Sequence, residues 1–497
     1  MEQALARLRR AFEGLVGLEQ PRRRLLERAA LQLRFGAGAS APLAVLTGPA
    51  GSGRHALAEA LARGLGGPLV ALDLRALGEA ELRGVPRAGG GLEPGALMRA
   101  LQGGPAPPAV LLLEHIDELA AGAPPAERAR AAAALRELLR GGLVDRFAGA
   151  AVRGAHTLLV ATAEHPAVIP PLLAGEVEVL LHHGYDRDQK VRIARERLLP
   201  EALRAAGAPP GSVEVTPAAL ERLVAEYAPE PGVAGLAERL GLVCRRAAAR
   251  IALGEADVVR LGPEELPELL GPPLARPLPA GAGAEIGAAW GLTWLRRGGE
   301  VTLVEALRAG SEPGLVRGSA VRPEALESAF AFIRGRAREL RIEREALLPA
   351  EVAIRATTLA PAGTGEDTAS LTGWGAGSTS LTASTATAGI DPGLDLAVLV
   401  ALVSLATDRP VRPDVAAVGE LTLRGGVRPP AGLPEMVLAA DRRGLRKVLV
   451  PAAGMDALER ALPASTLARL RLVPVERAEE AARESLIDIV IARELDR

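Results

Sequence analysis

The chain has 497 residues, which is enough for about two to four domains that each bury a core of their own. Its formal net charge is −1, so no overall field draws it toward nucleic acid or an anionic membrane surface, and neither is expected as a partner. Cys244 is the single cysteine, which excludes an internal disulfide framework and indicates a reducing, cytoplasmic compartment. Lys190 and Lys447 are the only lysines.

The first half of the chain contains clear periodic patterns. Residues 1–35 are predicted to form charged amphipathic helices, whose charge argues against a signal peptide. From 42 to about 183, apolar strands such as PLAVLTG and AVLLLEHID alternate with helical stretches, which is typical of a parallel α/β sheet. Residues 186–262 have a helical period. No uninterrupted apolar run reaches about 18 residues, so no membrane span is expected.

The last part begins with a tract rich in Pro and Gly at 263–283, the best linker candidate. Residues 284–497 mix strands and helices, which indicates an α+β domain. Within it, residues 362–390 are almost all Thr, Ser, Gly and Ala, and this insert fits a β-hairpin or an irregular loop equally well. Trp374, a rare aromatic here, would anchor the insert or mark an exposed contact.

The stretch LAVLTGPAGSGRHAL has the pattern of a strand, a glycine-rich loop and a helix. A phosphate-binding loop reads G-x-x-x-x-G-K-[ST], and Gly48, Gly51 and Gly53 provide its glycine framework. Arg54 stands in place of the lysine and His55 in place of the Ser or Thr. Arginine is bulkier and forked, and histidine has no hydroxyl for Mg²⁺, so the loop keeps its backbone pattern without its two functional side chains.

The order of P-loop domain, helical segment and mixed domain resembles the Lon family, whose members join an AAA+ ATPase to a Ser-Lys protease domain. The phrases EAELRGVPRAGGGLEPGAL, GLTWLRRGGEVTLVEA and GELTLRGGVRPPAGLPEMVLAADRRGLRKVLVP are similar to Lon segments. The resemblance implies N-terminal helices and an AAA+ P-loop parallel α/β domain in residues 1–185. It further implies a helical lid in 186–262 and a Lon-type α+β protease domain in 284–497.

The resemblance also assigns positions in the nucleotide pocket. Glu114 stands at the Asp that helps to hold Mg²⁺, and His115 at the Glu that polarises water. Glu164 stands at the Asn after the next strand, and Ala234 at the lid arginine. We therefore expect neither ATP nor Mg²⁺ to bind.

Three arrangements of the altered pocket are open. In the first, Arg54 or His55 pairs with Glu114 and fills the vacated space, because a buried charge needs a partner. In the second, His55, Glu114 and His115 form a transition-metal site, although no metal is expected. In the third, the loop amides still bind a nucleotide without hydrolysing it.

The family's protease site needs a serine nucleophile and a lysine base. Counting back from ALVSLATDRPV places the serine position at Gly393, whereas a register that matches TATAGI places it at Thr387. Asp391 and Pro392 have the pattern of an N-cap and a first helical proline, which favours Gly393. The lysine position falls on Pro434.

These positions lead to a functional prediction. Gly89 stands at the aromatic pore-loop residue with which Lon-type rings grip substrate. The prediction is a catalytically inactive, bacterial, Lon-like scaffold or regulator, and therefore not an enzyme. Its expected partners are further copies in a homo-hexamer, a second Lon-like chain, or client polypeptides. An ATP-independent chaperone-like ring and a residual ATP-independent peptidase that uses the insert are the alternatives.

Overall fold

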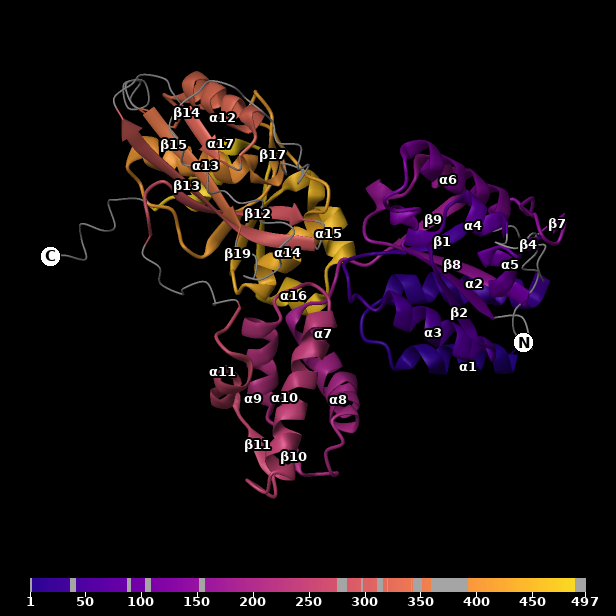
Figure 1. Cartoon of the computed structure of the whole chain (residues 1–497). Coiled ribbons are helices and arrows are strands. Elements are labelled where there is room, and N and C mark those ends of the chain that lie inside the picture. The colour runs from indigo at the N-terminus through magenta and orange to yellow at the C-terminus, as the bar shows by residue number, and fades with distance from the viewer. Residues whose placement is uncertain are drawn as a thin grey trace. The chain divides into compact units, whose positions relative to one another are not determined.

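The computed structural model describes residues 2–35, 42–86, 91–102, 109–151, 157–274, 284–295, 298–310, 316–319, 321–340, 342, 351–358 and 392–487 (Figure 1). The chain divides into two compact units, Met1–Gly184 and Tyr185–Arg497. The predicted positions Gly89, Trp374 and Thr387, and the whole insert 362–390, lie outside the described residues.

The first unit is built on a five-stranded parallel sheet in the order β2-β5-β8-β1-β9. Its strands are β1 (Leu43–Thr47), β2 (Leu69–Asp73), β5 (Val110–Glu114), β8 (Leu158–Ala163) and β9 (Val177–Leu181). All five residues of β1 are buried, as expected for a strand covered on both faces. The predicted parallel α/β domain is therefore confirmed.

Helices cover both faces of this sheet. On one face lie α1 (Glu2–Glu13), α2 (Glu19–Phe35) and α3 (Arg54–Leu65), whose apolar side chains share a core with Ala44 and Leu46. On the other lie α4 (Glu79–Arg83), α5 (Ala96–Gln102) and α6 (Pro125–Leu139), which pack with Leu43 and Val45. Alternate residues of β1 thus enter two separate cores. Two short antiparallel hairpins, β3 (Val85–Pro86) with β4 (Leu92–Glu93) and β6 (Val144–Asp145) with β7 (Ala150–Ala151), complete the unit.

The second unit begins with a helical lid. Its helices are α7 (Arg187–Ile193), α8 (Leu199–Ala205), α9 (Pro217–Arg222), α10 (Ala234–Ala252) and α11 (Leu266–Leu270), with π-helical turns at Ala194–Leu198 and Leu223–Tyr227. A parallel pair, β10 (Val213–Val215) and β11 (Val259–Leu261), was not predicted. The first residues of the predicted linker are helical, and Leu266 and Leu269 are buried in the lid core.

The rest of the second unit is a mixed sheet in the order β14-β15-β13-β12-β16-β19-β20. The strands are β12 (Ala288–Leu295), β13 (Gly298–Gly310), β14 (Val316–Ser319), β15 (Glu351–Thr358), β16 (Val415–Ala417), β19 (Lys447–Pro451) and β20 (Arg471–Val475), with a separate pair β17 (Glu420–Leu421) and β18 (Val427–Arg428). Strands and helices are intermixed here, so the predicted α+β domain is confirmed.

Six helices pack on this mixed sheet in two cores. They are α12 (Pro323–Arg336), α13 (Asp395–Thr407), α14 (Leu433–Arg442), α15 (Met455–Ala461), α16 (Ala464–Arg469) and α17 (Ala478–Ser485). Helix α13 is apolar on all sides and buried along almost its full length. It belongs to one core cluster, and α14 belongs to another. None of the helices in the described part of the chain has the length and apolar character needed to cross a membrane.

Candidate functional site

The glycine-rich loop has the backbone that the sequence predicts. It connects β1 to α3, and Gly53, immediately before the helix, has φ +86°. Gly48 has φ +153°, and a Cβ there would lie 2.3 Å from the carbonyl oxygen of His182. Both positions therefore require glycine. The loop brings Arg54 and His55 to the carboxyl ends of β5 and β8, where a parallel sheet gathers its functional side chains.

Arg54 turns into this pocket and binds the protein itself. Its Nη1 donates a hydrogen bond to the carbonyl oxygen of Ala163, the last residue of β8. Burial lowers the pKa of Arg54, and the nearby carboxylates of Glu164, Asp117 and Glu114 act in the opposite direction. These carboxylates offset part of the cost of desolvating the guanidinium.

His55 pairs with Glu114, the contact named in the first of the three arrangements, but the His55 side chain is 50% exposed, so the pair lies at the surface and does not fill a buried space. The distance from His55 Nδ1 to Glu114 Oε1 is 3.0 Å, and that from His55 Nε2 to Glu59 Oε1 is 3.6 Å. Glu114 ends β5, and the next residue, His115, has φ +58° at the start of a 3-10 turn. The backbone N–H of His115 donates to Thr162 Oγ1 at 3.2 Å. The pairing of His55 with Glu114 is therefore confirmed.

Two further side chains belong to the pocket and were missed from the sequence. Asp117 Oδ2 accepts the backbone N–H of Glu164 at 2.9 Å, which fixes the segment after β8. His182, directly after β9, donates its backbone N–H to Thr47 at 2.8 Å. Burial lowers the pKa of His182 to about 3, and the charges of His183 and Arg54 act in the same direction. The sequence signal that could have identified His182 is the pair of adjacent histidines, His182 and His183, directly after the apolar strand β9.

The metal-site alternative finds no support in the geometry. Among the residues that the structure describes, no group of three or more His, Cys, Asp or Glu side chains could hold a metal ion. Ala234 is the first residue of α10 and lies in the second unit.

Gly393 lies in a 3-10 turn, Pro392–Leu394, and α13 begins only at Asp395. The carbonyl oxygen of Gly393 accepts the backbone N–H of Gly419 at 3.0 Å, and Leu396 N donates to Gly419 O at 3.1 Å. The buried carboxylate of Asp395 accepts two bonds from Arg322 Nη2, at 2.9 and 2.7 Å. The turn is thus fixed by backbone pairing and an ion pair, and it presents no side chain at Gly393.

Pro434 is in the first turn of α14, after Gly432 with φ +73°. A Cβ at Gly432 would lie 2.5 Å from Trp294 Cδ1, which keeps the entry to this helix closely packed. Gly393 thus precedes α13, whereas Pro434 lies in α14, and these two helices belong to different cores. The side chain of Pro434 has neither a proton acceptor nor a donor.

Models of known protein families match three consecutive parts of the chain. The model of the Lon protease C-terminal proteolytic domain matches residues 260–385 and 383–488, and that of the Lon protease AAA+ ATPase lid domain matches 204–259. The chain belongs to the Lon protease family. The model of the ATPase family associated with various cellular activities matches residues 44–185, and this supports the predicted AAA+ domain.

Curated relatives match the sequence of this chain along almost its whole length. Lon protease of Phenylobacterium zucineum is 32% identical over 492 residues, which cover 97% of this chain and 58% of the relative. Lon protease of Dictyoglomus thermophilum is 29% identical over 95% of this chain and 57% of the relative, and Lon protease 2 of Sorangium cellulosum is 31% identical over 94% and 55%. The chain thus spans less than two thirds of the length of these relatives.

One prediction is wrong in the light of these matches. The residues at Gly393 and Pro434 predicted that the chain is not an enzyme. The match to a proteolytic-domain model and the relatives named Lon protease instead point to a peptidase. Different side chains at aligned positions do not by themselves establish a loss of activity.

Proposed function

We propose that this chain is an oligomeric Lon-family protein that binds polypeptides, and that its P-loop pocket is closed to Mg-ATP. The observation that carries the second part is the occupation of the pocket by its own side chains. Arg54 is hydrogen-bonded to Ala163 O, and His55 pairs with Glu114. A triphosphate would have to displace both contacts and approach the carboxylates of Glu114 and Glu164, which repel it.

Polypeptide binding follows from the relatives, which are named proteases. Assembly into a ring follows from the family resemblance, with a homo-hexamer as the expected state and a second Lon-like chain as another possible partner. Light scattering on the purified chain tests the assembly, because a monomer would contradict it.

The binding experiment uses fluorescein-labelled casein and fluorescence anisotropy. We expect saturable binding whose Kd is the same with and without millimolar Mg-ATP, because the pocket does not take the nucleotide. Absence of casein binding would overturn the polypeptide-binding function. A Kd that changes several-fold with Mg-ATP would overturn the closed pocket while leaving polypeptide binding intact.

A second candidate, peptide-bond hydrolysis without ATP, is favoured by the proteolytic-domain match. Gly393 and Pro434 provide neither nucleophile nor base, so the reaction would need a hydroxyl from another position, such as Thr387 of the insert. Cleavage of a fluorogenic casein that disappears when the insert's Ser and Thr residues are changed to alanine would support this candidate. Cleavage that persists in the substituted protein would contradict it.

A further inference from the structure

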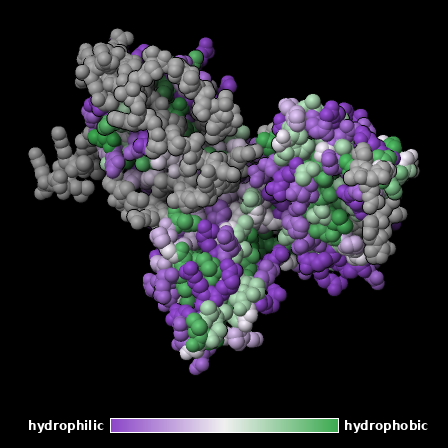
Figure 2. Space-filling model, in the orientation of Figure 1, coloured by the Kyte–Doolittle hydropathy of each residue, from purple (hydrophilic) through white to green (hydrophobic). Residues whose placement is uncertain are grey.

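A lysine is buried inside the lid of the second unit. Lys190 lies in α7, which Asp186 caps, and it has no exposed surface. Lysine is almost never buried in this way unless its charge is paired. Its Nζ donates hydrogen bonds to the carbonyl oxygens of Ala228 and Glu230, the second at 2.6 Å. Figure 2 shows hydrophilic residues on the surface of the lid, where a charged side chain keeps its water.

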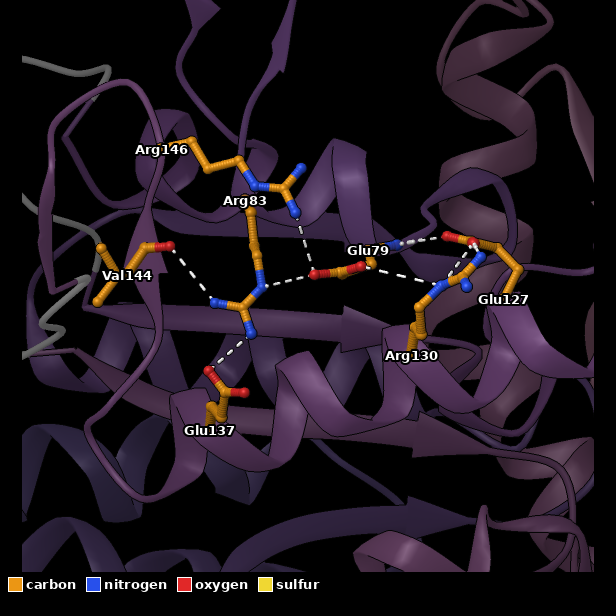
Figure 3. A network of polar contacts seen from close by, with 7 residues as sticks. All are labelled: Glu79, Arg83, Glu127, Arg130, Glu137, Val144 and Arg146. Atoms are coloured by element: carbon orange, nitrogen blue, oxygen red, sulfur yellow. Dashed lines mark hydrogen bonds and ion pairs between the residues drawn. The ribbon is translucent and has the colours of Figure 1, made fainter.

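The bonds of Lys190 differ from those of the arginines in the first unit. In the network that Figure 3 shows, Arg83 contacts Glu79 at 3.1 Å and Glu137 at 2.6 Å. Arg146 contacts Glu79 at 3.2 Å in the same network. The two acceptors of Lys190 are neutral carbonyl oxygens instead. Such acceptors offset the cost of burying a charge less than a carboxylate does, so burial disfavours the ammonium form.

Charged groups from the lid and from the proteolytic domain lie near this ammonium. They are Glu230 and Arg239 of the lid, Glu300 of β13 and Arg442 of α14. Burial lowers the pKa of Lys190 to about 8, and the charges of Arg442 and Arg239 act in the same direction. The charges of Glu230 and Glu300 oppose this shift in pKa. The site as a whole therefore favours the neutral amine.

The other acids near this ammonium have arginine partners of their own. Glu300 contacts Arg443 at 3.2 Å. Asp188, two residues earlier in α7, pairs with Arg469 of α16, which also contacts Asp441 at 2.7 Å. These acids neutralise arginines, and little negative charge is left to stabilise the buried ammonium.

The two carbonyl acceptors belong to the segment 228–231, which also touches the proteolytic domain. Tyr185 donates its backbone N–H to the carbonyl oxygen of Pro231 at 2.8 Å. A Cβ at Gly298, the first residue of β13, would lie 2.7 Å from Pro231 Cγ. The start of β13 therefore packs directly on this lid segment.

Arg442 contacts the same end of β13. Its Nη2 donates to the carbonyl oxygen of Gly299 at 3.1 Å, and the charge of Glu230 acts on it. Lys190 from the lid and Arg442 from the proteolytic domain thus meet at one junction, which the segment 228–231 and the start of β13 form.

We propose that Lys190 is a proton-controlled latch, which holds the segment 228–231 against β13 more firmly when its amine is neutral than when it is charged. A neutral amine keeps two N–H donors, so both carbonyl oxygens stay hydrogen-bonded. It has no charge to desolvate and does not repel Arg239 or Arg442. Neither nucleotide nor polypeptide takes part in this latch, which is therefore separate from the proposed function.

The direction of the pH effect follows from proton binding. The pKa of Lys190 is about 8 when the junction is closed, whereas an exposed lysine has its ordinary value of 10.5. Between these values the open junction binds more protons than the closed one, so rising pH stabilises the closed form. From pH 7 to pH 9, the ratio of closed to open forms should rise about tenfold.

Hydrogen exchange of the full chain, corrected for the intrinsic exchange rate at each pH, measures this ratio. The amide of Tyr185, which donates to Pro231, should be about tenfold better protected at pH 9 than at pH 7. The amide of Arg146, which donates to Arg83 in the first unit, is the reference and should change by less than about twofold.

Two lysine variants separate the latch from other titrating groups. Lys190→Arg keeps a positive charge and N–H donors but does not lose its proton in this range, so it should abolish the pH effect at Tyr185. Lys447→Arg makes the same change at the chain's only other lysine, which pairs with Glu484, and should keep the effect. An equal pH effect in the native and Lys190→Arg chains would overturn the latch, because another group would then control the junction.

An NMR titration of the native chain decides the matter where Lys190→Arg does not fold. The chain has two lysines, so ¹³C labelling at lysine Cε gives two signals, and the signal that remains in Lys447→Arg belongs to Lys190. Its pKa should be about 8. A pKa near 10.5 would refute the latch, since the amine would then stay charged at both pH values.

Discussion

At the residue scale, the chemistry of the glycine-rich loop depends on Arg54 and His55, which directly follow its last glycine, Gly53. Gly48 and Gly53 have positive φ angles, and the helix that follows begins with Arg54 and His55. The guanidinium is bonded to Ala163 O and the imidazole to Glu114. A glycine-rich loop is thus followed by two side chains that contact the protein's own β5 and β8.

His182 gives a prediction at this scale. Its pKa is about 3 in the folded chain and near 6.5 when exposed, so between these values the unfolded chain binds more protons. The free energy of unfolding should therefore fall as pH falls below about 6.5. Between pH 7 and pH 4.5 this one group should cost about 2 kcal/mol. Urea unfolding at the two pH values measures it.

The control for His182 is His182→Gln, which removes the titrating ring and should lose about 2 kcal/mol less than the native chain over the same pH interval. Equal acid sensitivity in the native and His182→Gln proteins would show that this ring is not the source.

The sequence identified some of this pocket but not all of it. The glycine spacing predicted the loop, and the need of a buried charge for a partner predicted that Arg54 or His55 would pair with Glu114. Asp117 and His182 were missed because neither belongs to a spaced motif, and their contacts depend on how far each chain segment runs past its strand. Such contacts form only once the sheet has assembled in the order β5-β8-β1-β9.

At the element scale, the lid is attached to the mixed-sheet part by Arg469 of α16. Its Nε and Nη2 contact Asp441 of α14 at 3.0 and 2.7 Å, and its Nη1 bonds Asp188 of α7. Asp188 follows Asp186, which caps α7 through Gln189 N and also accepts Ser465 Oγ. One arginine thus links three helices that are distant in sequence.

Arg469→Ala should lower the unfolding free energy of the second unit. Breaking a buried pair costs about 3–5 kcal/mol, and the partial exposure of Arg469 reduces the expected loss to about 1–2 kcal/mol. Hydrogen exchange should quicken at the first turn of α7. Arg483→Ala, an exposed change on α17, should alter neither quantity. Unchanged exchange at α7 in Arg469→Ala would show that the link is not structural.

The elements themselves were largely predictable. Apolar segments predicted β1, β2, β5 and β8 of the parallel sheet and β12 and β13 of the mixed sheet, but not β9, β14 or β15. The pair β10–β11 has only three residues in each strand and gives no readable period. The start of α13 was expected at Pro392, but a 3-10 turn precedes the helix, which begins at Asp395. The pairing of Gly393 with Gly419 constrains this turn, and a local N-cap pattern cannot indicate such a contact.

At the scale of the whole molecule, the chain keeps the domains of its family. Its AAA, lid and proteolytic domains each match a family model. Fold and pocket chemistry depend on different residues: apolar cores and glycines maintain the first, and a few polar side chains decide the second. The family is therefore clear from the sequence, whereas the activity has to be measured.

The most direct test of the closed pocket is the Tm of the purified chain with and without millimolar Mg-ATP. A ligand that binds only the folded state raises Tm in proportion to its saturation. Because Arg54 is bonded to Ala163 O and His55 to Glu114, we predict no change in Tm. A rise of several degrees would show that the nucleotide displaces these side chains, and would contradict the account.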